Sequence, residues 1–135
     1  GSKRMEMYKK ISLISIPLDM SDVLDEFIDR FGIPPREVRR LLKISLIRAI
    51  SSKCDIKKVE YRDGTLIFSS DKPSLATWSE VFGHFNMLAI RGTTAPTVQA
   101  RVKSADEAID LASEVLGKYF EIITLSEEDN AKKEE

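Results

Sequence analysis

Cysteine and histidine are almost absent from this sequence, and their scarcity excludes several kinds of site. The 135-residue chain has one cysteine, Cys54, and one histidine, His84. No disulfide can form within the chain, and a zinc site built from cysteine and histidine ligands is excluded. The sequence has no Walker loop, no dinucleotide-binding glycine motif and no serine nucleophile elbow. We therefore expect no enzymatic activity, no cofactor and no metal.

Long hydrophobic runs are missing as well. No apolar segment approaches the length of a membrane span, and no signal peptide is evident. With its single cysteine, the chain is expected to be a cytoplasmic protein without a membrane partner. Charged residues make up 32% of the chain, which is above the usual fraction and is a tendency of heat-adapted, thermophilic proteins.

The two ends of the chain have little to bury. Gly1 and Ser2 resemble residues left by cloning, and residues 1–8 are expected to be disordered. Residues 126–135 contain five acids and two bases, and this acidic tail is also expected to be disordered. Residues 9–125 are then expected to form a single domain.

Helical spacing and turn residues define the expected elements of the first half. A β-rich run over residues 11–18 predicts a strand that Pro17 ends. Apolar residues at helical spacing predict a helix over residues 21–31, which Gly32 terminates. Two consecutive prolines open a second helix that is expected to span residues 35–52. The expected apolar face of that helix consists of Val38, Leu41, Leu42 and Ala49.

A hairpin is the clearest local signal in the second half. The strand-like runs 56–61 and 65–69 flank Asp63-Gly64, a pair that favours a type I′ turn. The other expected elements are a helix capped by Ser74, strands Met87–Arg91 and Thr97–Lys103, and a helix opened by the Ser104–Glu107 capping box. The order predicts an α+β fold, with a mainly antiparallel sheet of about four to six strands and about four helices on one face.

The second helix carries a basic stripe. Four cations share one side of its first half, namely Arg36, Arg39, Arg40 and Lys43. Such a cluster suits the phosphates of a nucleic acid. The alternatives are a solvated helix face, or neutralisation by the acids Asp25, Glu26 and Asp29 of the preceding helix.

Aromatic residues recur on the third helix. Trp78, Phe82 and Phe85 lie along one stripe, where bases could stack on exposed rings. The alternative is that this stripe is the buried face of the helix, with Trp78 and Phe85 the candidates for exposure.

A polar sheet face is the third candidate surface. Gln99, Arg101 and Lys103 alternate with apolar residues along one strand, and Arg91 could join them from the next. Sheets with such faces bind single-stranded nucleic acid in several folds. The alternatives are an open, solvated sheet and a face that forms a homodimer.

The helices-on-sheet order, the basic helix and the aromatic stripe resemble the archaeal single-stranded DNA-binding protein ThermoDBP and its relatives. The resemblance covers roughly residues 9–125, and it implies a cleft that takes single-stranded nucleic acid with apolar and basic side chains. A C-terminal leucine-zipper segment is replaced here by the short acidic tail.

These features lead to one functional hypothesis and one alternative. The hypothesis is non-enzymatic binding of single-stranded DNA or RNA, and its candidate residues are Arg36, Arg39, Arg40, Lys43, Trp78, Phe85, Arg91, Arg101 and Lys103. The alternative is a protein-interaction module, either a homodimer or a subunit of a larger complex.

Overall fold

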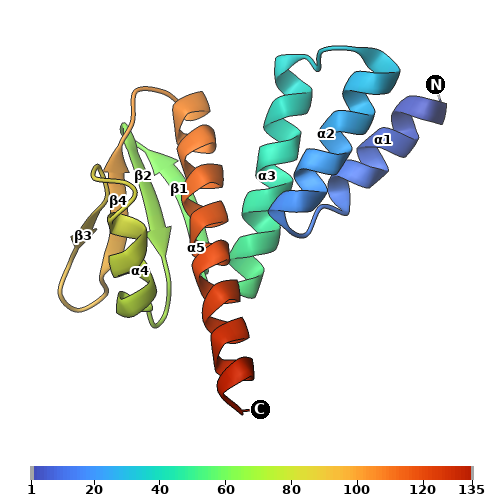
Figure 1. The fold of residues 1–135 in the computed structure, drawn as a ribbon. Coiled ribbons are helices and arrows are strands. Elements are labelled where there is room, and N and C mark those ends of the chain that lie inside the picture. The colour runs from blue at the N-terminus through green and yellow to red at the C-terminus, as the bar shows by residue number, and fades with distance from the viewer. Residues whose placement is uncertain (1, 135) are drawn as a thin grey trace.

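The fold is an α+β arrangement in which a long helix lies between a sheet and a group of three helices (Figure 1). The computed structural model describes residues 2–134. In chain order the elements are α1 (Ser2–Ser12), α2 (Pro17–Phe31), α3 (Arg36–Lys53), β1 (Lys58–Arg62), β2 (Thr65–Ser69), α4 (Leu75–Phe82), β3 (Ala89–Arg91), β4 (Thr97–Arg101) and α5 (Ala105–Glu134). The predicted class is therefore confirmed, with four strands and five helices in the described part of the chain.

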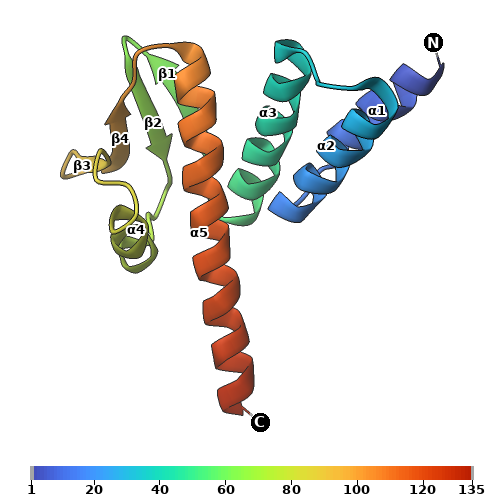
Figure 2. The ribbon, with the colours of Figure 1, turned by 45° about the horizontal axis from the view of Figure 1, so that its top comes forward.

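The sheet is antiparallel throughout, with strand order β1-β2-β4-β3. Phe68 of β2 pairs with Val98 of β4, so both side chains point to the same face. That face is buried, and α4 and α5 lie on its side of the sheet (Figure 2). The hydrophobic core therefore sits between the sheet and α5 and continues from α5 to α3.

The turn between β1 and β2 has the predicted type I′ backbone. Asp63 and Gly64 both have positive φ, at 51° and 74°. This conformation matches the right-handed twist of the two strands and fixes their register, in which Arg62 lies opposite Thr65.

The strand expected over residues 11–18 is wrong, because this segment joins two helices. α1 continues to Ser12, and α2 starts at Pro17. The carboxylate of Asp19 accepts hydrogen bonds from the backbone N–H groups of Ser15 (2.9 Å) and Ile16 (3.2 Å). These bonds satisfy the turn without a neighbouring strand, so local capping overrides the β preference of the isoleucines.

Both chain ends also differ from the expected disorder. Residues 2–12 form a helix that buries Met7 and Ile11 and is tied to α2 by an ion pair between Lys10 and Glu26 (2.5 Å). Residues 126–134 continue α5, whose last turn carries Lys132 and Lys133 near its negative end. Gly1 and Glu135, at the ends of these segments, lie outside the described residues.

The start of α5 agrees with the predicted capping box. The hydroxyl of Ser104 accepts a hydrogen bond from the Glu107 backbone N–H (3.1 Å). The Glu107 carboxylate accepts in turn from the backbone N–H of Lys103 (2.8 Å). The first bond satisfies an orphan donor of the helix N-terminus, and the second reaches the residue before the N-cap Ser104 rather than Ser104 itself.

The buried face of α3 is rotated from the predicted one. Its buried side chains are spaced four residues apart, namely Val38, Leu42, Leu46 and Ile50. Leu41 is 40% exposed, and its inclusion in the core is therefore wrong. α3 packs on α5 and also on α1 and α2, and these tertiary contacts determine which side of the helix is buried.

Asp55 ends α3 in a conformation that favours glycine. Its φ is 54°, and the next backbone N–H, from Ile56, donates to the Ser51 carbonyl (3.0 Å). Replacing Asp55 by glycine is expected to raise the free energy of unfolding by about 0.5–1 kcal/mol. Urea unfolding measures the change. The control is Asp71→Gly, at a loop position without positive φ, which should give no gain.

Candidate interaction surfaces

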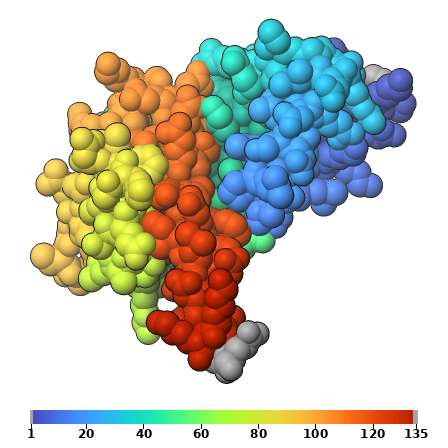
Figure 3. All heavy atoms as spheres, viewed as in Figure 1, coloured from blue at the N-terminus to red at the C-terminus, as the bar shows by residue number. Residues whose placement is uncertain are grey.

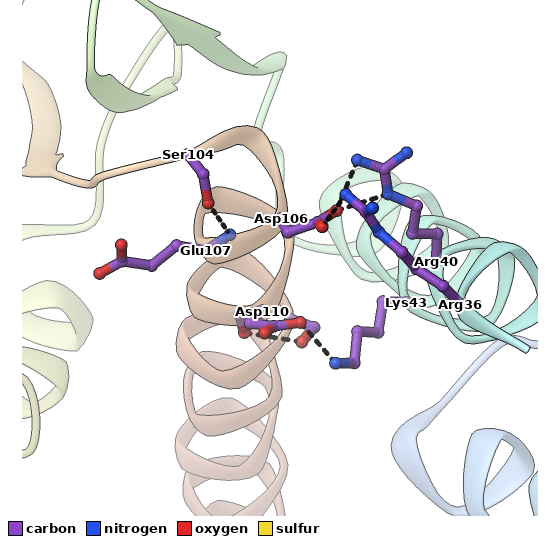
Figure 4. A network of polar contacts seen from close by, with 8 residues as sticks. Arg36, Arg40, Lys43, Ser104, Asp106, Glu107 and Asp110 are labelled. Atoms are coloured by element: carbon purple, nitrogen blue, oxygen red, sulfur yellow. Dashed lines mark hydrogen bonds and ion pairs between the residues drawn. The ribbon is translucent and has the colours of Figure 1, made fainter.

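The basic stripe of α3 faces the first turns of α5 (Figure 4). Arg36 and Arg40 both pair with Asp106, and the Arg40 Nε–Asp106 Oδ1 distance is 2.6 Å. Lys43 pairs with Asp110 one turn further along α5. Three of the four positive charges in the basic stripe are therefore neutralised within the fold, but by acids of α5 rather than by those of α2. Arg39, the fourth cation, is exposed beside them.

These ion pairs make the stability of the α3–α5 contact depend on pH. Desolvation acts to raise the pKa of Asp106, but the Arg40 hydrogen bond and the charges of Arg36 and Arg40 outweigh it and lower the pKa below its ordinary value. The carboxylate therefore stabilises the fold fully above its unfolded-state pKa of about 3.9. That contribution is lost as the pH falls through the lower pKa of the folded state.

Asp106→Asn is therefore expected to lower the free energy of unfolding at neutral pH and to flatten its pH dependence below about pH 4. Urea unfolding between neutral and acidic pH measures both effects. Glu114→Gln, a neutral replacement on an exposed position of the same helix, is the control. An unchanged pH profile in Asp106→Asn would show that the two arginines do not hold this carboxylate.

Trp78 lies in the core rather than on a surface. Its side chain is 1% exposed. Its ring contacts those of Phe68 at 5.5 Å, Tyr119 at 4.9 Å and Phe82 at 6.3 Å between centroids. Phe85, the second predicted stacking residue, is half-buried against the same core. Trp78 and Phe82 of the stripe thus face the core, as the alternative interpretation of the sequence holds, whereas Phe85 lies beyond the end of α4 rather than on it.

The remaining predicted cations lie on the other side of the molecule from α3. Arg101 lies opposite Thr65, and Arg91 lies opposite Thr97. By strand alternation these side chains point away from the core face of the sheet. Lys103 follows β4 and is exposed. Because α5 separates α3 from the sheet (Figures 1 and 2), the structure does not unite these residues and Trp78 in one cleft.

An apolar groove lies between α5 and the turn that joins α1 to α2. Its lining, which we call the α5 groove, consists of Ile16, Pro17, Leu18, Gly117, Phe120, Glu121, Thr124 and Leu125. In Figure 3 the blue surface of this turn region adjoins the red surface of α5, whose end projects beyond it. Leu18 is 64% exposed and Leu125 is 52% exposed. Clustered exposed apolar side chains of this kind mark interaction surfaces.

Gly117 is an unusual residue for the middle of a helix. A Cβ built at this position meets no atom within 4 Å, and the residue lies inside α5. Gly117→Ala is expected to raise the free energy of unfolding by about 0.5–1 kcal/mol, because alanine favours the helix. Thermal unfolding checks this. A loss of stability would show that the position is crowded within the fold.

A second apolar surface lies at the opposite end of the helical group. It is lined by Arg4, Met7, Tyr8, Phe27, Phe31, Ile33, Pro35 and Val38. Ile33 stands in the short loop between α2 and α3 and is 89% exposed. Gly32, with φ at 82°, ends α2 just before it, as the sequence predicts.

Cys54 is the single free cysteine among the titratable groups of residues 2–134. These residues contain no group of three His, Cys, Asp or Glu side chains placed to hold a metal ion. Burial, with a smaller effect of the Asp55 and Glu127 charges, raises the pKa of the Cys54 thiol to about 11. The thiol is therefore protonated at neutral pH and is a poor nucleophile. Over the same residues, no helix is long and apolar enough to span a membrane.

Comparisons with known proteins all match this chain to transcription-repair coupling factors. Residues 1–79 match the family model described as the TRCF domain. The transcription-repair-coupling factor of Escherichia coli is 35% identical over 57 residues, which is 42% of this chain and 5% of that protein. A crystal structure of the C-terminal domain of a transcription-repair coupling factor superposes with a TM-score of 0.73 at 23% identity. The match covers 90% of this chain and 81% of that one, and it shows a shared fold.

These findings overturn the resemblance to the archaeal single-stranded DNA-binding family. The expected archaeal, thermophilic origin and the nucleic-acid cleft are wrong with it. The basic helix and the aromatic stripe carried that resemblance, and the fold uses both internally, in the ion pairs of α3 and in the core around Trp78. The family match extends over more than half of the sequence. The chain belongs to the TRCF domain family.

Proposed function

We propose that this chain is a non-enzymatic protein-interaction domain of a transcription-repair-coupling factor. The observation that carries the proposal is the TRCF domain match over residues 1–79. The matched segment of 57 residues is only 5% of the length of the Escherichia coli relative, so the chain spans a small part of that protein.

The distribution of apolar side chains supports this role. Leu18 and Leu125 are more than half exposed beside the α5 groove, and Ile33 is almost fully exposed at the other end of the helical group. Three of the four cations in the basic stripe of α3, Arg36, Arg40 and Lys43, are paired with Asp106 and Asp110 instead. The surface thus favours apolar contact with a protein over backbone contact with a nucleic acid.

The name of the curated relative indicates the class of partner. It describes a factor that couples transcription to repair. We therefore expect the partners of this domain among proteins that act in these two processes. We also propose a cytoplasmic location, since bacterial DNA is transcribed there.

Binding to a panel of purified transcription and DNA-repair proteins from the same source tests the proposal. The labelled chain is titrated with each protein, and oligo-dT serves as the nucleic-acid comparator. We expect at least one protein to bind with a Kd of about 10 µM or tighter. Saturable binding of oligo-dT with no response to any protein of the panel would overturn the proposal.

A further inference from the structure

We propose that the α5 groove binds an amphipathic helix of a partner protein, with leucine-like side chains on one face and Lys or Arg beside them. The inference rests on the proposed function and names the surface that performs it. The groove is lined by Ile16, Pro17, Leu18, Gly117, Phe120, Glu121, Thr124 and Leu125.

The groove is walled by two helical elements. One wall is a stretch of α5 more than two turns long, from Gly117 to Leu125. The other is the first turn of α2, where Leu18 projects into solvent. Leu13, in the same connection, is 69% exposed. Leu18 and Leu125 thus offer exposed apolar contacts from two elements that line the same groove, as a helix laid in a groove requires.

Gly117 supplies an independent reason for a close-packed occupant. Glycine is among the least favourable residues for a helix interior. At this position the fold gains nothing from it, because the space beside its Cα is open. The same space forms part of the groove. A partner backbone can approach most closely where a side chain is missing, so an occupant explains this glycine and the isolated fold does not.

The charge of the occupant follows from the acids along the same side of α5. Glu114, Glu121 and Glu128 are seven residues apart and therefore lie in one row beside Gly117. Of the nearby cations, Lys118 pairs with Glu121 at 3.4 Å, Lys132 lies one turn after Glu128 on α5, and Lys53 donates a hydrogen bond to Ser15. The row of acids remains in excess, so Lys or Arg on the flanks of a bound helix would find complementary charge.

A synthetic helix provides the direct test. The probe is a fluorescein-labelled, hydrocarbon-stapled peptide of about five turns, with leucine at every third or fourth position and lysine beside each leucine. A twin peptide carries glutamate in place of lysine. Fluorescence anisotropy measures binding of both peptides to the wild-type chain. We expect micromolar binding of the lysine peptide and binding of its twin at least about tenfold weaker.

Two variants alter the groove at positions outside the core. Gly117→Gln fills it with a good helix former at an open position, and Leu18→Gln removes an exposed anchor. Each should weaken binding of the lysine peptide by about tenfold or more. Leu75→Gln is the matched control, because Leu75 is 60% exposed on α4, away from the groove. It should leave the affinity within about twofold.

Every other outcome speaks against the inference. Equal binding to all variants, equal binding of the twin, or no binding of the lysine peptide would overturn it. A dimer that Gly117→Gln dissociates in sedimentation equilibrium would show that a second copy occupies the groove, which also contradicts the proposed occupant. A protein of the panel that binds wild type and Gly117→Gln equally would retain the proposed function and reject the groove.

Discussion

Trp78→Ala is expected to lower the free energy of unfolding by about 3–5 kcal/mol. The side chain is 1% exposed and contacts aromatic rings from the sheet, from α4 and from α5. Its removal opens a cavity where these three layers meet, and ring–ring contacts are lost with it. Since domains of this size are stable by about 5–15 kcal/mol, much of the total would be lost. Urea unfolding followed by far-UV circular dichroism measures the change.

Two controls separate the core role of Trp78 from a surface role. Trp78→Phe keeps most of the ring and should be milder than alanine. Leu75→Ala, on the same helix but 60% exposed, should change the free energy by less than about 1 kcal/mol. In the wild type, acrylamide should quench the single tryptophan poorly. Ready quenching, or a cost in Trp78→Ala no larger than in Leu75→Ala, would contradict the burial of this ring.

Leu46→Ala is expected to cost about 2–5 kcal/mol. Leu46 is 2% exposed on the face of α3 that joins the helical group to the core around α5. The truncation leaves a cavity there, and the exposed or half-exposed ion pairs between α3 and α5 contribute little that could offset it. The loss should therefore weaken the attachment of the helical group. Urea unfolding gives the free energy, and native-state hydrogen exchange locates the loss.

Leu41→Ala is the matched control for this prediction. Leu41 lies on the same helix, but it is 40% exposed, so its truncation leaves no closed cavity. We expect a cost below about 1 kcal/mol. Similar costs for the two leucines would mean that the buried face of α3 is the one expected from the sequence rather than the one in the structure.

Local signals in the sequence predict the elements that local interactions determine. Asp63-Gly64 fixes the first hairpin, Ser104 and Glu107 open α5, and Gly32 follows the end of α2. The segment over residues 11–18 fails because its isoleucines favour a strand by propensity, whereas Asp19 and Pro17 impose a turn and a new helix. Capping by a residue downstream of the segment decided the outcome.

The expectation of a nucleic-acid-binding surface fails for a different reason. The arginines of α3 form a stripe whether they face solvent or the acids of α5, and only the tertiary structure brings Asp106 within 2.6 Å of Arg40. Trp78 has the same helical spacing in a core as on a stacking surface. Periodicity identifies a face of a helix, but it does not tell what covers that face.

One residue of the α5 groove, Gly117, can be singled out from the sequence alone. Gly117 interrupts an otherwise favourable helical pattern, and such a glycine in a helix interior suggests a packing or functional reason. Leu18 gives no such signal, because the sequence pattern places it at the end of a strand. Only the structure places the two residues on the same groove.

Parallel titrations test most directly whether the domain acts through its apolar groove. Wild type and Leu18→Gln are each titrated with the transcription and repair protein panel and with oligo-dT in one low-salt buffer. The account predicts a panel protein that binds wild type with a Kd of about 10 µM or tighter and Leu18→Gln at least about tenfold more weakly, with no saturable response to oligo-dT. Tight binding of oligo-dT by both chains, with no protein bound, would contradict it.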